Sequence, residues 1–101
     1  MQFITQILLP RCNNFGLRFS RADYRPFHAR MVRKFGGWSR KGLADGAWLS
    51  PSGQLYAEDH WVYEVGHEHR SLRFWRMEKE RLKLEFDQEE IWMIQYQGRR
   101  I

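Results

Sequence analysis

Cysteine is nearly absent from this chain of 101 residues, which contains one, Cys12. A single cysteine excludes a disulfide within the chain, and we expect a reducing, cytoplasmic location. Long apolar runs are also missing, since no stretch approaches the roughly 20 residues that a membrane-spanning helix needs. Thr5 and Gln6 interrupt the apolar N-terminal segment, which lacks the basic start and cleavage site of a signal peptide. We therefore expect no membrane association.

The motifs of several common chemistries are missing too. The chain has no Gly-x-Gly-x-x-Gly, no Walker-type phosphate loop and no Gly-x-Ser-x-Gly. These absences argue against dinucleotide binding, nucleoside triphosphate binding and standard hydrolase catalysis. We expect no cofactor.

Apolar and aromatic residues are plentiful by contrast. They make up 43% and 16% of the chain, and five residues are tryptophan. This composition is sufficient for a packed core and is unlike that of a disordered chain. A chain of this length has room for one core, so we expect a single domain over residues 1–101.

The charge is unevenly distributed along the chain. Residues 1–44 contain nine Lys or Arg and one acid, a balance of +8, whereas residues 45–101 contain eight Lys or Arg and eleven acids, a balance of −3. Two interpretations remain open. The basic half could meet an anionic partner, or the two halves could neutralise each other within the domain or across a dimer.

Periodicity predicts six elements in the order strand, helix, strand, strand, helix, strand. Ser20 and Asp23 are both possible N-caps of the first helix, and we expect Asp23, which would leave Pro26 in the first turn. Glycines at 42 and 46 and Asp45 should break any longer strand before Ala47. The expected elements cover residues 3–9, 24–35, 47–49, 54–65, 71–86 and 91–96.

This order is typical of a ferredoxin-like α+β sandwich, in which a four-stranded antiparallel sheet has both helices on one face. The predicted strands carry large apolar residues on both sides, so the helix-free face should also be covered. We expect a homodimer or a small-molecule ligand there. The residues that we expect to bind the partner or ligand are Trp61, Tyr63, Trp92, Ile94 and Tyr96.

Several short motifs also resemble those of a family of short bacterial proteins known only as a domain of unknown function. The resemblance extends over residues 5–94 and implies a shared fold, but it implies no catalytic residue. The motifs that carry it, in order, are Tyr24-x-x-Phe27, Lys34-Phe35-Gly36-Gly37-Trp38, Gly46-Ala47-Trp48, Pro51-Ser52-Gly53 and Phe86-Asp87-Gln88-Glu89.

Two groups of residues could carry chemistry. His60 and Glu64 share one side of the third predicted strand and are candidates for a general acid–base pair, or simply a hydrogen-bonded surface pair. His67 and His69 have the spacing to hold one metal ion if that strand reaches them. The alternative is a polar loop before the second helix, where Glu68 favours the positive helix end.

Basic residues of the first helix and the segment after it could instead bind the phosphates of a nucleic acid. No Lys/Arg-Gly-Phe/Tyr signature of the ferredoxin-like RNA binders is present. The candidate phosphate-binding residues are Arg25, Arg30, Arg33, Lys34, Arg40 and Lys41.

We therefore expect a non-enzymatic binding or interaction module that uses its helix-free sheet face. The two rival hypotheses are a small enzyme with a His/Glu pocket on that face and a nucleic-acid binder that uses the first helix.

Overall fold

The computed structural model describes residues 2–101 and contains the six expected elements in the expected order. Within these residues, neither helix is long and apolar enough to cross a bilayer. The elements are β1 (Gln2–Pro10), α1 (Arg21–Phe35), β2 (Ser39–Leu49), β3 (Leu55–His67), α2 (Leu72–Glu85) and β4 (Met93–Gly98).

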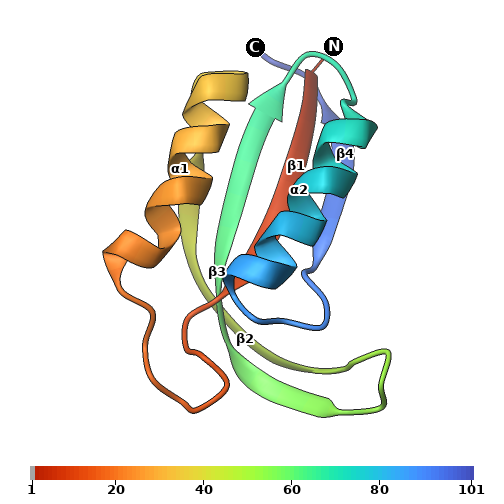
Figure 1. Ribbon diagram of the computed structural model, residues 1–101. Helices are drawn as coiled ribbons and strands as arrows, with labels where there is room; N and C mark the ends of the chain where they lie inside the picture. The colour runs from red at the N-terminus through yellow and green to blue at the C-terminus, as the bar shows by residue number, and fades with distance from the viewer. Residues whose placement is uncertain (1) are drawn as a thin grey trace.

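The four strands form one antiparallel sheet in the order β2-β3-β1-β4, and both helices cover the same face of it (Figure 1). Every strand pairing is antiparallel, with Thr5 of β1 opposite Val65 of β3 and Gln95 of β4. The protein is therefore an α+β ferredoxin-like sandwich, as the sequence predicted. The central strands β1 and β3 place the core under the two helices.

Alternation along β1 and β3 builds this core, because every second side chain points toward the helices. Ile7, Leu9 and Val65 are fully buried there, and Phe27 of α1 packs edge-on against Tyr63 of β3 at 5.1 Å between ring centroids. The other buried apolar residues of the core are Tyr24, Met31, Trp75, Leu82, Phe86 and Ile91.

Helix α1 begins three residues earlier than the sequence predicted. Ser20, not Asp23, is the N-cap. The Asp23 carboxylate lies in the first turn, where it accepts hydrogen bonds from the Ser20 N–H at 2.7 Å and the Ser20 hydroxyl at 3.1 Å. Because the helix begins at Arg21, Pro26 lies beyond its first turn rather than within it, and the Ser20–Asp23 hydrogen bonds stabilise this start.

Strand β2 is much longer than the expected residues 47–49, and the prediction that glycines break it was wrong. Gly42 adopts a φ of 134° and produces a register shift against β3 between Arg40 and Gly42. The glycine therefore forms a bulge, which bends the strand without ending it. Beyond the bulge, pairing continues to Leu49 and the predicted turn at residues 50–53.

The far end of the β2–β3 hairpin extends past both helices and curves below the α2–β4 loop (Figure 1). Its tip is attached to that loop because the Ser52 hydroxyl hydrogen-bonds the Glu89 carboxylate at 2.7 and 2.8 Å. Hydrogen bonds from the Ser50 and Ser52 side chains lower the pKa of Glu89. These bonds hold one end of the sheet in a curved shape.

Candidate functional site

The helix-free face of the sheet, called the open face below, carries the even-numbered residues of β1, β3 and β4. This placement corrects the assignment of Trp61 and Tyr63, which lie on the helix-covered face. Tyr63 is fully buried under α1, and the Arg40 guanidinium lies 4.2 Å from the centre of a Trp61 ring. The sequence analysis placed members of both alternating sets of β3 on the helix-free face, and only the set with His60 and Glu64 lies there.

Trp92, Ile94 and Tyr96 do lie on the open face, as predicted, at the β4 edge. Their exposed fractions are 56%, 40% and 41%, so this edge presents a half-exposed apolar strip. The Tyr96 hydroxyl donates to the Glu64 carboxylate at 2.9 Å, and Glu64 also accepts from the Gln6 amide at 3.3 Å. The hydrogen bond to Glu64 and the negative charge beside it raise the pKa of Tyr96.

A cavity of about 570 Å³ lies at the curved end of the open face, between the β2–β3 hairpin and the α2–β4 loop. Leu8, Ala44 and Gly46 contribute to its lining from the sheet, whereas Trp48 and Trp92 contribute from the two edges. This volume is in the range of small-molecule binding sites. We call this cavity the open-face pocket.

Small residues make the pocket possible. Ala44 pairs with His60 and Gly46 pairs with Glu58 across the β2–β3 ladder, so β2 offers little side-chain volume there. A Cβ atom added at Gly46 would meet no other heavy atom within 4 Å. The bend of the hairpin and its attachment to Glu89 then enclose this space. Two of the three residues that the sequence analysis treated as strand breakers, Asp45 and Gly46, are therefore part of the pocket wall.

The main polar feature beside the pocket is the pair formed by His60 and Glu58. The His60 Nδ1 atom lies 3.2 Å from the Glu58 backbone oxygen, which can only accept, so Nδ1 carries the proton of the neutral ring. The His60 Nε2 atom lies 3.7 Å from Oε1 of the Glu58 carboxylate. That oxygen is buried and has no hydrogen-bond partner, and burial raises the pKa of Glu58.

The structure does not bring His60 and Glu64 together. Both are on the open face, but four residues of extended strand separate them by about 13 Å. Glu64 is hydrogen-bonded to the β4 side, whereas His60 lines the pocket. Sequence analysis missed Glu58, which is the carboxylate next to His60, although the same two-residue alternation would have placed it there.

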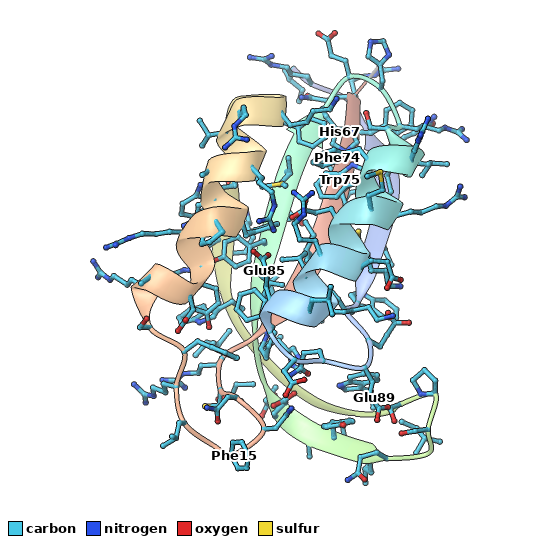
Figure 2. The ribbon with its side chains drawn as sticks, in the orientation of Figure 1. Phe15, His67, Phe74, Trp75, Glu85 and Glu89 are labelled. Carbon is cyan, nitrogen blue, oxygen red and sulfur yellow. The ribbon has the colours of Figure 1, made fainter. Side chains whose placement is uncertain are left out.

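The structure also does not bring the side chains of His67 and His69 together as metal ligands. Strand β3 does extend to His67, but this ring is 5% exposed and packs against Trp75 of α2, close to Phe74 (Figure 2). Its Nδ1 atom hydrogen-bonds the His69 backbone oxygen, and its Nε2 atom accepts from the Thr5 hydroxyl at 2.8 Å. Over residues 2–101, no group of three His, Cys, Asp or Glu side chains is arranged to hold a metal ion.

These contacts are compatible with the neutral form of His67. The Thr5 oxygen in turn accepts a hydrogen bond from the Gln95 amide at 3.1 Å, so the hydroxyl proton points to His67. Burial lowers the pKa of His67. The residue is thus a structural link between β1, β3 and β4 at the helix-covered face.

The candidate phosphate-binding residues fall into two groups. Arg30 is occupied within the helix layer, because its guanidinium hydrogen-bonds the buried carboxylate of Glu78 at 2.6 to 3.1 Å and that of Glu85 at 2.6 and 3.0 Å. Figure 2 shows Glu85 between the two helices. The remaining candidates are exposed, namely Arg25, Arg33, Lys34, Arg40 and Lys41.

Charge divides between the layers of the fold as well as between the halves of the chain. The two helices contain ten Lys or Arg and four acids, a balance of +6, whereas all other residues contain seven and eight, a balance of −1. Because both helices cover one face, the basic surface and the open face lie on opposite sides of the molecule.

Comparisons with protein-family models and with curated proteins find no match to this chain.

Proposed function

We propose that this protein is a small binding module that takes a small molecule with an apolar or aromatic body into the open-face pocket. The observation that carries the proposal is the lining of the pocket, which is mainly hydrocarbon with two indole rings and few polar groups. Such lining is typical of ligand sites, where apolar surface supplies affinity and a few polar groups supply orientation.

A titration followed by nitrogen-15 NMR tests this function. Aromatic fragments should shift the indole N–H signals of Trp48 and Trp92, and Gly46→Phe should abolish the shifts by filling the pocket. Gly46 has an ordinary backbone conformation and free space at its Cβ position, so the substitution should leave the fold intact. Shifts that are absent, or that are unchanged in Gly46→Phe, would contradict the proposal.

We further propose that the strip formed by Trp92, Ile94 and Tyr96 is a homodimer contact. Strand β4 is an edge of the sheet, and an apolar edge strand is suited to pairing with a second chain. Ile94→Lys should therefore reduce the sedimentation mass of the protein to that of one chain. The control is Leu84→Lys, since Leu84 is 85% exposed on α2 and lies outside the strip. A native protein that sediments as a single chain would contradict this contact.

Nucleic-acid binding is a second candidate, which the balance of +6 in the helix layer favours. Contacts to phosphate by Arg25, Arg33 and Lys34 would be weakened by salt, because binding releases counterions. Charge reversal at Arg33 and Lys34 should abolish retardation of a DNA or RNA duplex, whereas reversal at Lys41 should have a smaller effect. Binding that is insensitive to salt would contradict this candidate.

A further inference from the structure

We propose that the ligand of the open-face pocket is an organic amine, bound as an ammonium ion attached to an apolar or aromatic body. This inference rests on the proposed function, since it names the class of molecule that the pocket takes. Three features of the pocket support it, and each concerns a different property of an ammonium group.

The first feature is the charge of the lining. The protein as a whole has a net charge of +5, yet no Lys or Arg is among the residues that line the pocket. Asp45 and Glu90 are among them, although Glu90 is paired with Lys79 at 2.9 Å. An anionic ligand would therefore find no matching cation in the pocket, and the local charge favours a cation.

The second feature is the pair of indole rings. Trp48 stacks on Tyr56 with 5.3 Å between ring centroids, which holds one indole in place, and Trp92 is 56% exposed at the opposite edge. The faces of aromatic rings attract cations, and indole attracts them most strongly. A ligand that combined an apolar body with an ammonium group would use both properties of these rings.

The third feature is a missing hydrogen-bond donor. His60 Nε2 and Glu58 Oε1 are 3.7 Å apart, and the Glu58 oxygen has no donor. While His60 is neutral, both atoms are acceptors. An ammonium group carries several N–H bonds, so it could donate to His60 from within the pocket while its charge offsets that of the carboxylate behind it.

The test compares three probes of similar size, namely 2-phenylethylamine, 2-phenylethanol and 3-phenylpropionate, in the same NMR titration. We expect the amine to bind about tenfold more tightly than the alcohol, which corresponds to about 1.4 kcal/mol. The propionate should bind more weakly than the alcohol. Equal binding of amine and alcohol, or preference for the propionate, would overturn the amine inference and leave the proposed function intact.

Two carboxylate variants locate the source of the preference. Glu58→Gln keeps the shape of the side chain and removes its charge, so the advantage of the amine should fall to about twofold. Neither carboxylate lines the pocket, but Glu58 contacts His60, which does. Glu64→Gln is the matched control, since Glu64 lies on the same strand and face and is hydrogen-bonded to Tyr96 instead. An advantage that Glu58→Gln leaves unchanged would overturn the role of the His60–Glu58 pair. If none of the three probes binds, the proposed function fails together with this inference.

Discussion

The two faces of the sheet differ in how completely their buried charged groups are paired. On the helix-covered face, the Glu78 carboxylate is 2% exposed and is held by the Arg30 guanidinium. On the open face, the Glu58 side chain is 20% exposed, but its Oε1 atom is hidden from solvent and has no hydrogen-bond partner. A paired buried charge holds elements together, whereas an unpaired one lowers stability and favours a ligand.

A buried side-chain polar atom without a hydrogen-bond partner is unusual within the described chain. Over residues 2–101, the other buried side-chain polar atom without a partner is the indole nitrogen of Trp75, on the helix-covered face. An uncharged N–H is less costly to bury than a carboxylate oxygen. The comparison between Glu78 and Glu58 therefore predicts that equivalent substitutions on the two faces have very different consequences.

The largest effect is expected when Arg30 is removed. In Arg30→Met, the Glu78 carboxylate remains buried without its partner, so the free energy of unfolding should fall by about 3–5 kcal/mol in urea denaturation. Arg30→Met combined with Glu78→Leu should recover most of this loss. The control is Arg11→Met, which breaks a more exposed pair with Asp59 and should cost about 1 kcal/mol or less. A small loss in Arg30→Met would contradict the conclusion that the buried Glu78 carboxylate depends on its pairing with Arg30.

A second prediction compares isoleucines on opposite faces. Ile7 is fully buried in β1, and Ile94 of β4 is 40% exposed on the open face. Ile7→Ala should lower the free energy of unfolding by about 2–5 kcal/mol, because it leaves a cavity in the core. Ile94→Ala should lower it by about 1 kcal/mol or less at low protein concentration. A greater loss that grows with protein concentration would indicate that Ile94 lies in a dimer interface.

These contrasts explain why sequence analysis predicted the strand order but not the residues that form the pocket. Alternation and helical period locate the elements, and their order restricts the sheet to few topologies. Alternation separates the residues of β3 into two sets, but it does not say which set faces the helices. Trp61 and Tyr63 were misplaced because aromatic side chains are equally suited to a core and to a ligand site.

The pocket depends on features that act between distant segments. The bulge at Gly42 bends β2, and the bond between Ser52 and Glu89 joins segments 37 residues apart. Glu78 is polar on a helical wheel and is buried because Arg30 reaches it from the other helix. None of these contacts has a local pattern, although the small residues Ala44 and Gly46 opposite large ones on β3 could have indicated a hollow.

The third prediction concerns pH and the helix-covered face. Burial lowers the pKa values of His67 and His28 below the ordinary value of 6.5. The unfolded chain then binds protons more readily than the folded one, so stability should decrease as the pH falls through 6.5 and level off below the folded pKa values. Urea denaturation at a series of pH values measures this slope.

His67→Gln identifies the share of that slope that comes from His67. A neutral amide keeps hydrogen-bonding capacity near Thr5 and cannot become charged in this range, so the dependence on pH should become weaker. His69→Gln is the control, because His69 is exposed and only its backbone oxygen contacts His67. A slope that is unchanged in His67→Gln would show that His67 is not the source.

The smallest effect on stability is expected for Glu58→Gln, which also tests the contrast most directly. Burial raises the pKa of Glu58, so the folded state favours the protonated carboxyl, and stability from this group is lost as the pH rises through its raised pKa. The amide has no charge to bury and can donate to His60. Glu58→Gln should therefore match or exceed the native protein near neutral pH, within about 1 kcal/mol in urea denaturation. A loss as large as that of Arg30→Met would mean that the Glu58 carboxylate stabilises the fold, and the two faces would then not differ.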